Sequence, residues 1–271
     1  MKILGDVLNY LRCPCCNIHS SFTSEIESKL VCSKCSATFS YAEGFIDFLP
    51  DYPGSRGNAQ KTMENGFIVK IYENYVRPRF TSLGTTVKYD DEEQWLSRQV
   101  SRLTPTITVD LACGTGRYAR IMSRDYNAQI VFGVDLSKPM LKLAIERDRE
   151  LGIDNIIYMR ADSANLPLAR ESSNWVNIFG ALHLFPNPQQ AINEISRISE
   201  KGALVTFLTA RKLDDSIILK NIQRQFSKIA DFIFFSESEL EQAFLTQGYG
   251  PLSKECHGML LIGSSVKLQN T

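Results

Sequence analysis

The sequence has no excess of charge of either sign and no long apolar run. Its 30 lysine and arginine residues balance 30 aspartate and glutamate residues, so there is no overall positive field to attract nucleic acid or an anionic membrane. The longest uncharged stretch, residues 172–193, is interrupted by asparagine and proline, which predicts a buried strand and a loop rather than a membrane span. Asp6 precedes any apolar run, so we expect no secretory signal and a cytoplasmic protein.

Cysteine is almost absent beyond residue 36. Five of the seven cysteines lie before that point, and such clustering without an export signal favours metal binding over disulfides. The chain has 271 residues, 44% of them hydrophobic, which is enough for one large domain and a small module. We therefore expect the cysteine-rich segment to form a module of its own.

The cysteine spacing is that of a zinc ribbon, which we expect over residues 1–50. Two CxxC pairs are separated by fifteen residues, and two thiolates three positions apart can hold a tetrahedral ion from one tight turn. The expected ligands are Cys13, Cys16, Cys32 and Cys35, with Cys15 as a spare thiol that could substitute for Cys13 or Cys16. Four sulfur ligands leave no position for water, so the zinc would be structural. The alternative, two redox-active pairs, lacks the βαβ context that such pairs usually have.

Residues 51–104 are expected to form a linker and a helical lid. Residues 51–58 are rich in proline, glycine and serine, which is typical of a linker. Apolar residues recur at helical spacing over about 59–103, with interruptions at Pro78 and Gly84. The segment also contains a cluster of aromatic and basic side chains that could line a pocket or anchor a carboxylate, or could be packed core: Tyr72, Tyr75, Arg77 and Arg79.

Residues 105–271 alternate between strand and helix patterns. Strands are expected from 106 to 110, 129 to 134, 155 to 159, 175 to 179 and 203 to 208, and helices from 116, from 138 to 151 and from 188 to 199. This alternation predicts an α/β, doubly wound parallel sheet that binds its ligand beyond the carboxyl ends of the strands. Ser236 and Glu239 predict a capping box, and two late strands around residues 256–258 predict a closing antiparallel hairpin.

A glycine-rich turn follows the first of these strands. Gly114 and Gly116 come just after Asp110. Glycine lets the backbone approach a ligand, and the next helix would direct its N-terminal N–H groups at it. The turn predicts a site for a nucleotide-like cofactor, although Gly114-x-Gly116-x-x-Ala119 also fits the dinucleotide fingerprint.

Three acids at strand ends bear on the choice between a dinucleotide and S-adenosylmethionine, and two of them discriminate. Asp135 ends the second strand, where both a dinucleotide and S-adenosylmethionine require an acceptor for ribose hydroxyls. Asp162 follows the third strand, where it could read an adenine edge. Asp110 would repel a pyrophosphate at the glycine turn but tolerate a cationic amino-acid tail. The acids therefore favour S-adenosylmethionine over NAD.

Several motifs together resemble the class I methyltransferases of the ubiquinone/menaquinone type. The resemblance covers about residues 106–266, and it rests on the segments 110–116, 133–141, 160–162, 181–188 and 195–202. With the ribbon and the Tyr72–Pro78 segment, nearly the whole chain is similar to zinc-ribbon methyltransferases of plants and bacteria. The resemblance implies a Rossmann-like, seven-stranded methyltransferase sheet. Bacterial large-subunit rRNA guanine-N1 methyltransferases share the same general layout.

The resemblance also implies the residues that hold S-adenosylmethionine. Asp110, Ala112, Gly114 and Gly116 would surround the methionine part, Asp135 the ribose, Leu136 and Met140 the adenosine, Asp162 and Ser163 the adenine, and Gly180 the sulfonium, with Tyr72 and Arg77 also at the cofactor. Two positions depart from the pattern. Ala112 stands where many relatives have glycine, and Asn174 stands where an acid commonly precedes the fourth strand.

The expected activity is methyl transfer to a small-molecule acceptor, such as a secondary metabolite or a quinone-like compound. Positioning dominates such an in-line displacement. His183, just past the fourth strand, is the candidate base, or else a packing residue. Residues 59–103 and 211–235 would roof the pocket, with Phe226–Phe235 as apolar walls. The alternatives are an rRNA guanine methyltransferase whose ribbon grips RNA and a protein that binds the cofactor without transferring methyl.

Overall fold

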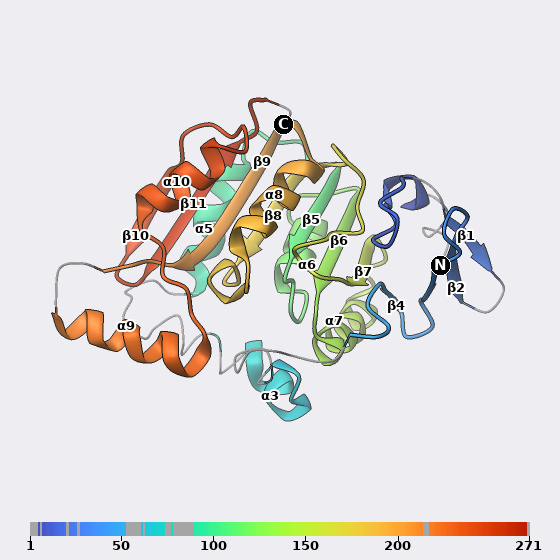
Figure 1. Ribbon diagram of the computed structural model, residues 1–271, viewed down its shortest axis with the longest axis horizontal. Helices are drawn as coiled ribbons and strands as arrows, with labels where there is room; N and C mark the ends of the chain where they lie inside the picture. The colour runs from blue at the N-terminus through green and yellow to red at the C-terminus, as the bar shows by residue number, and fades with distance from the viewer. Residues whose placement is uncertain are drawn as a thin grey trace.

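A single mixed sheet runs through the protein. The computed structural model describes residues 5, 7–19, 22–25, 28–52, 61, 63–73, 77, 89–213 and 217–269. Within these residues eleven strands form one sheet in the order β1-β2-β3-β4-β7-β6-β5-β8-β9-β11-β10 (Figure 1). The sheet therefore continues from the cysteine-rich segment to the C-terminal hairpin.

The α/β part of the sheet confirms the predicted winding. Its parallel strands are β5 (Ile107–Leu111), β6 (Ile130–Asp135), β7 (Ile156–Arg160), β8 (Ser173–Phe179) and β9 (Ser199–Ala210). β11 (Leu260–Val266) pairs antiparallel with β9, and β10 (Ser253–His257) pairs antiparallel with β11. The strand order reverses at β5, since β6 and β7 are added on one side of it and β8 and β9 on the other. Such a reversal point is where open α/β sheets bind ligands.

The expected seven-stranded sheet was wrong in extent, because the ribbon adds four strands. These are β1 (Phe22–Glu25), β2 (Lys29–Cys32), β3 (Thr38–Ser40) and β4 (Phe45–Asp47). β4 pairs in parallel with β7, with Phe45 opposite Tyr158 and Asp47 opposite Arg160. Without β4, β7 would be an edge strand with unpaired backbone groups. The three residues of β4 are all buried, so pairing and apolar burial favour the same arrangement.

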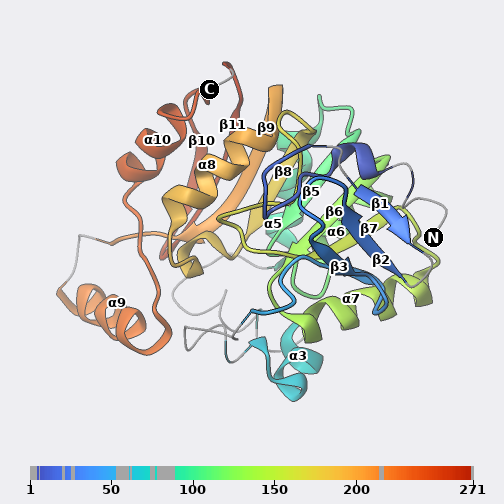
Figure 2. The ribbon, with the colours of Figure 1, turned by 45° about the vertical axis from the view of Figure 1, so that its right-hand side comes forward.

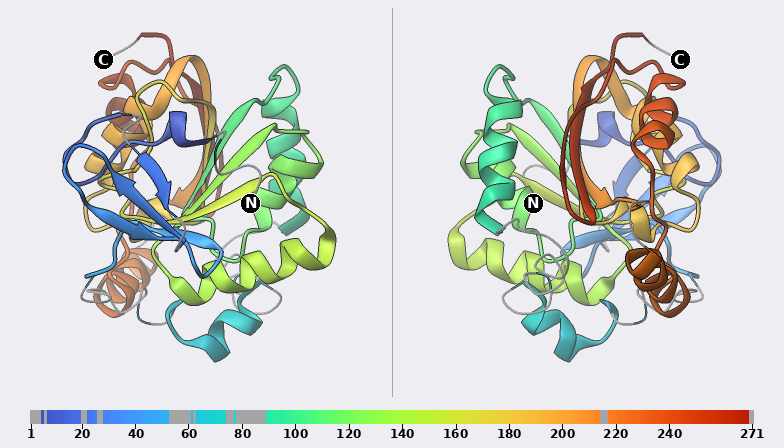
Figure 3. Two further views of the ribbon diagram at one scale, coloured as in Figure 1. Left: turned by 90° about the vertical axis from the view of Figure 1, so that its right-hand side faces the viewer. Right: turned by 90° about the vertical axis from the view of Figure 1, so that its left-hand side faces the viewer.

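Helices cover both faces of the sheet. α5 (Tyr89–Val100), α6 (Arg117–Arg124) and α7 (Lys138–Leu151) lie on one face. α8 (Pro188–Ile198) and α10 (Glu237–Leu245) lie on the other face, together with the ribbon (Figures 2 and 3). β9 ends at Ala210 and the chain passes to α9 (Ile217–Ala230), which Figure 1 shows below the sheet on the same side as α3 (Gly66–Ile71). α3 and α9 therefore lie at the carboxyl edge of the parallel strands.

The ribbon shares its core with the sheet. Leu11, Leu30 and Phe39 belong to the same buried cluster as Val109 of β5 and Phe244 of α10. A segment of this size buries little apolar surface alone, and packing against the sheet adds to it. The ribbon is thus packed as a continuation of the α/β layers, and the domain boundaries at residues 50 and 104 stay predictions.

α5 belongs to the opposite core. Trp95 and Leu96, which lie within the expected lid, are at most 2% exposed and pack with Tyr118 and Met122 of α6. None of the helices in the described part of the chain has both the length and the apolar character needed to cross a bilayer.

Side-chain caps fix several helix starts. Ser236 and Glu239 form the predicted capping box of α10. The hydroxyl of Ser137 accepts the Met140 N–H at the start of α7, and the Asn187 amide oxygen accepts the Gln190 N–H at the start of α8. Each cap satisfies a backbone donor that the helix cannot satisfy itself.

Candidate functional site

The four predicted metal ligands lie together. The Sγ atoms of Cys13, Cys16, Cys32 and Cys35 are all within 4.8 Å of one another. Cys13 lies 3.6 Å from Cys35 and Cys16 lies 3.7 Å from Cys32, sulfur to sulfur. A tetrahedral zinc ion with bonds of about 2.3 Å places its sulfurs about 3.8 Å apart. The donor set and its spacing therefore fit zinc, and exposed Cys15 lies outside the cluster.

Two turns of similar backbone geometry build this cluster. We call residues 13–17 the first knuckle and residues 32–36 the second knuckle. The N–H of the fifth residue donates to the carbonyl of the first in both, from Asn17 to Cys13 and from Ser36 to Cys32, each at 2.8 Å. Asn17 and Ser36 both have φ near +60°. Each knuckle is thus a tight turn that presents two of the four clustered thiols to the same point.

The glycine-rich turn has three residues in the left-handed region. Ala112, Gly114 and Gly116 have φ of 56°, 54° and 79°. A Cβ on Gly116 would lie 2.4 Å from the Tyr158 hydroxyl, so this glycine is required by packing. A Cβ on Gly114 would meet no atom within 4 Å. Gly114 thus borders open space, as a residue that approaches a cofactor should.

Asp135 ties the glycine-rich turn to the end of β6. Its carboxylate accepts the N–H groups of Gly114 and Ser137, each at 2.8 Å. Burial raises its pKa, while these backbone donors act in the opposite direction. Ribose binding by Asp135, as the sequence suggests, would use the remaining lone pairs of its oxygens.

Asp110 lies inside the protein, behind the glycine-rich turn. It is 2% exposed, and its Oδ1 accepts a hydrogen bond of 2.9 Å from the Asn177 side chain. Two more hydrogen bonds extend this network: the Thr206 hydroxyl donates to Asn177 Oδ1, and the Trp175 indole N–H donates to the Thr206 hydroxyl. Burial raises the pKa of Asp110 to about 7. Asn177 and Thr206 were not expected from the sequence, since neither belongs to a recognisable motif.

Residues 162–168 form a loop after β7, which we call the 162–168 loop. Exposed Asp162 accepts the Ala164 N–H with Oδ1 at 2.9 Å, and its carbonyl accepts the Asn165 N–H. Ser163 is half-buried. The Asp162 carboxylate keeps an open side toward solvent, where a ligand base could meet it.

Leu136 and Met140 follow β6 at the carboxyl edge of the parallel strands. Met140 is 2% exposed and lies in the first turn of α7, while Leu136 is half-buried. The sequence thus placed both residues next to Asp135 through chain connectivity alone.

Arg77 lies next to Gly180 at the end of β8. A Cβ on Gly180 would lie 3.3 Å from the Arg77 guanidinium, and the φ of Gly180 is +79°. Arg77 pairs with fully buried Glu92 at 3.0 Å and lies over the Tyr118 ring. The pairing partner Glu92 was missed by the sequence analysis, although it neutralises the arginine beside the proposed sulfonium position.

His183 is buried beside these residues. Burial, with a smaller effect of Arg77, lowers its pKa to about 4. Its ring packs against Phe232 with centroids 4.8 Å apart, and its carbonyl accepts the Ile233 N–H. The expected apolar segment Phe226–Phe235 therefore reaches His183.

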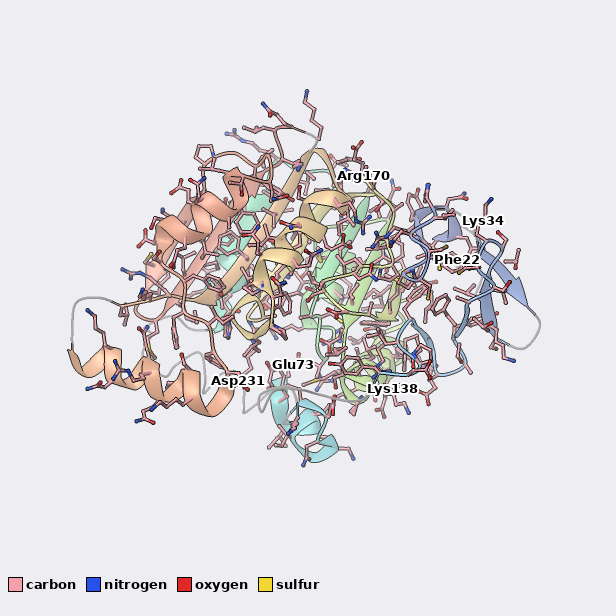
Figure 4. The ribbon with its side chains drawn as sticks, in the orientation of Figure 1. Phe22, Lys34, Glu73, Lys138, Arg170 and Asp231 are labelled. Carbon is pink, nitrogen blue, oxygen red and sulfur yellow. The ribbon has the colours of Figure 1, made fainter. Side chains whose placement is uncertain are left out.

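Glu73 is a second residue that the sequence analysis missed. Its carboxylate accepts a bond of 2.6 Å from the Thr115 hydroxyl in the glycine-rich turn. It also pairs with Arg120 of α6 and Arg147 of α7. In the view of Figure 4, Glu73 lies between α3 and the lower edge of the sheet. The sequence did contain one signal, because three arginines in the two helices nearest the glycine-rich turn require an acidic partner: Arg117, Arg120 and Arg147.

The described part of the predicted lid is thus close to the glycine-rich turn. Tyr72, half-buried, immediately precedes Glu73. Tyr75, Pro78, Arg79 and Gly84 lie outside the described residues, as does most of the expected linker. A separate cavity of about 300 Å³ lies between α5 and the β10–β11 hairpin, and Leu208 and Trp95 are among the residues that line it.

Comparisons with known proteins agree with this geometry. Residues 109–207 match the family described as "methyltransferase domain". An uncharacterized chloroplastic methyltransferase of Arabidopsis thaliana is 25% identical over 95% of this chain and 78% of its own length. The demethylmenaquinone methyltransferase of Lactiplantibacillus plantarum is 24% identical over 64% of this chain and 76% of its own length.

The chain is an S-adenosylmethionine-dependent methyltransferase. Among solved structures, phosphoethanolamine N-methyltransferase 2 of Haemonchus contortus matches with a TM-score of 0.63. The identity is 15%, and the match covers 78% of this chain and 60% of that one. This likeness shows a shared Rossmann-like fold. The family match begins at residue 109, so it does not cover the cysteine cluster of the methyltransferase.

Proposed function

We propose that the protein methylates a small-molecule acceptor and that its cofactor lies across the carboxyl ends of β5, β6, β7 and β8. The observation that carries this proposal is the open space at Gly114, bordered by Asp135, with Asp162 and Gly180 at the ends of neighbouring strands. In this proposal Asp135 accepts from the ribose, Asp162 from the adenine, and the backbone at Gly114 borders the methionine part.

The acceptor class is supported by the charge of the chain and by its relatives. One relative is named a demethylmenaquinone methyltransferase, and one structural neighbour is a phosphoethanolamine methyltransferase. Both act on small molecules by name. The balanced charge of the present sequence agrees with a partner that needs no polyanion-binding surface.

The protein's own groups position and shield the reacting atoms. Bound S-adenosylmethionine supplies an electrophilic methyl group on sulfur. Arg77 lies at Gly180 but is neutralised by Glu92, so the pair limits repulsion of a cationic cofactor. His183 is neutral at pH 7, because its pKa is about 4, and it can accept a proton only weakly. The main contribution of these residues is therefore orientation and exclusion of water.

We also propose that Cys13, Cys16, Cys32 and Cys35 hold a structural zinc ion. The sulfur spacing supports this assignment, and four thiolates would complete a tetrahedral shell. A closed shell has no position for substrate, so this ion would stabilise the ribbon and take no part in methyl transfer.

The cofactor assignment is tested by Gly114→Ala. The added methyl group meets no protein atom, so the variant should fold with a loss of about 1 kcal/mol from backbone strain. Calorimetry should show binding of S-adenosylhomocysteine by the wild-type chain and at least about tenfold weaker binding by the variant. Unchanged affinity in a folded variant would contradict the proposed position of the cofactor.

The acceptor class is tested with labelled cofactor in cell extract. Methyl label should enter a small, organic-soluble compound, and prior nuclease treatment should leave the yield unchanged. Loss of labelling after nuclease treatment would instead support the rRNA alternative. That alternative has less support, because Arg12, one of the few basic residues of the ribbon, pairs internally with Glu194 at 3.1 Å. No labelled product in any fraction would support binding without transfer.

A further inference from the structure

The first knuckle is hydrogen-bonded to the 162–168 loop. The Asn165 side-chain amide donates to the carbonyl of Pro14, which lies between Cys13 and Cys16, at 3.0 Å. Arg12, next to Cys13, donates to the Asn165 side-chain oxygen at 2.6 Å. Asn165 therefore forms both of its side-chain bonds with residues of the ribbon.

The backbone reinforces this connection. The Arg12 N–H donates to the Pro167 carbonyl at 3.1 Å, and the Ala169 N–H donates to the Tyr10 carbonyl at 2.8 Å. Leu11 and Leu168 face each other as an isolated antiparallel bridge, and both are fully buried. The chain that leads into the first knuckle thus runs alongside the end of the 162–168 loop.

Glu194 of α8 bonds both the 162–168 loop and the ribbon. Its Oε2 accepts the Leu166 N–H at 2.7 Å and pairs with Arg12 at 3.1 Å. Glu194 is 6% exposed. A buried carboxylate shared by the loop and the ribbon is a strong, geometrically specific connection.

The ribbon also reaches the opposite side of the proposed adenosine position. Asp47 at the end of β4 pairs with Arg160 at 3.2 Å, and Arg160 Nε donates to the carbonyl of Leu136 at 3.0 Å. The Leu49 carbonyl accepts a further bond of 2.7 Å from Arg160. Ribbon residues therefore connect to both Leu136 and Asp162. Arg160 makes the first connection, and Asn165 makes the second.

We propose that the ribbon acts as a support for the adenine-binding loop, with Asn165 as the positioning residue that couples metal binding at the first knuckle to cofactor affinity. This inference rests on the proposed function, because it requires zinc at the four cysteines and adenine at Asp162. Asn165 does not touch the cofactor in this account. It fixes the loop that carries Asp162.

The physical reason is that the loop has no regular secondary structure of its own between Asp162 and Leu166. A loop of this kind samples several conformations unless outside bonds restrict it. The Pro14 carbonyl is a fixed acceptor only while the knuckle is held, and a metal ion bound by four thiolates holds it. Occupancy of the metal site and affinity for the cofactor must then be linked, and each must favour the other.

Asn165→Ala tests the coupling without touching a metal ligand or a cofactor contact. We expect the variant to retain one zinc ion per chain and to bind S-adenosylhomocysteine about tenfold more weakly by calorimetry. Removing zinc from the wild-type chain with a chelator should weaken binding by a similar factor. The same treatment of Asn165→Ala should weaken binding by a smaller factor than it does in the wild-type chain, because the side-chain bond to the first knuckle is already missing. Lys34→Ala, at an exposed position of the second knuckle, is the matched control and should bind as the wild type does.

A selectivity measurement separates positioning from a general loss of stability. S-inosylhomocysteine lacks the adenine amino group, so a correctly placed Asp162 should favour S-adenosylhomocysteine over it. Asn165→Ala should narrow this preference, whereas mere destabilisation would weaken both ligands equally. Unchanged affinity and preference in the variant, or no effect of zinc removal on the wild-type chain, would overturn the inference. If the wild-type chain fails to bind S-adenosylhomocysteine at all, the proposed function itself fails.

Discussion

The two knuckles and the strand-end site are built in different ways. Each knuckle supplies two clustered thiols from five consecutive residues, and the two knuckles are brought together by the short strands β1 and β2. The strand-end site, which we define as Gly114, Asp110, Asp135, Asp162 and Gly180, takes its residues from the ends of four strands spread over 71 residues. Local geometry determines the first site, and the sheet determines the second.

The difference has an energetic side. The knuckles depend on a ligand that would complete them, since four clustered thiols gain stability when a metal replaces their protons. The strand-end site is held by bonds within the protein, such as those from Asp135 to Gly114 and Ser137. It also contains buried ionisable groups whose cost depends on pH. Changes at the two sites should therefore differ in size and in the conditions that reveal them.

The largest effect is expected at the knuckles. Cys32→Ser removes a buried thiol of the proposed metal site and should abolish stoichiometric zinc binding, as measured by metal analysis. Because structural zinc contributes on the order of 10 kcal/mol, Tm should fall by more than about 10 °C. Cys15→Ser, at the exposed cysteine outside the cluster, is the control and should change neither quantity. Retained zinc in Cys32→Ser would show that the ligand set is wrong.

A pH-dependent effect is expected at Asp110. Its pKa rises from 3.8 to about 7 in the folded protein, so the neutral form is favoured there, and the stability that this provides is lost as the pH rises from about 4 to about 7. The full difference is about 4 kcal/mol. Asp110→Asn keeps an acceptor for Asn177 but cannot ionise, so its stability relative to the wild type should be greater at pH 8 than at pH 5.

Chemical denaturation of both chains at the two pH values measures this difference. The pKa of His183 is lowered, so its contribution is present above about pH 6.5 and is lost as the pH falls toward 4. This opposite trend is common to both chains and cancels in the comparison. Asp125→Asn, at an exposed position, should change stability by less than about 0.5 kcal/mol at either pH. Equal pH profiles for the wild type and Asp110→Asn would contradict the burial argument.

A smaller effect is expected at Gly116. A Cβ there meets the Tyr158 hydroxyl at 2.4 Å, so Gly116→Ala should cost about 3 kcal/mol from crowding and left-handed strain together. Gly114→Ala adds a methyl group to open space and should cost only about 1 kcal/mol. Adding Tyr158→Phe to Gly116→Ala should recover part of the loss by removing the clashing oxygen. If urea denaturation shows the same loss of stability for Gly116→Ala and Gly114→Ala, left-handed strain alone explains both losses and the crowding argument is wrong.

The smallest effect is a gain at Ala112. This residue has φ of 56° without being glycine, which costs an L-residue about 1 kcal/mol. Ala112→Gly should therefore raise the free energy of unfolding by about 0.5–1 kcal/mol, as measured by urea denaturation. A loss of stability would mean that the alanine methyl group contributes more by packing than it costs in strain.

Much of the fold could be predicted from the sequence. The expected helix over 138–151 matches α7, and the expected strand over 175–179 lies within β8. The capping box at Ser236 and the closing hairpin were also correct. These elements have strong local signals, namely periodicity and cap residues, that do not depend on the rest of the chain.

The parts that failed depend on contacts distant in sequence. The sheet continues into the ribbon because β4 meets β7, which lies over 100 residues later in the chain. Glu73 was missed because a single acid after an aromatic residue has no distinguishing pattern until its partners are placed. Glu92 was missed because it lies in a run of four acids, residues 90–93, and only the structure shows which of them is buried against Arg77. Asn177 likewise looks like an ordinary strand residue until it is seen to bond Asp110.

The sequence by itself determined the order of strands and helices, the four clustered thiols and the acids at the strand ends. Each of these follows from neighbours within a few residues, where backbone geometry leaves little choice. Only the tertiary structure decided that the ribbon is part of the sheet, that Arg77 is neutralised by Glu92, and that Asn165 connects the first knuckle to the 162–168 loop. Those pairings depend on which edges and buried charges meet when the layers pack, and burial makes an unpaired group too costly to leave alone.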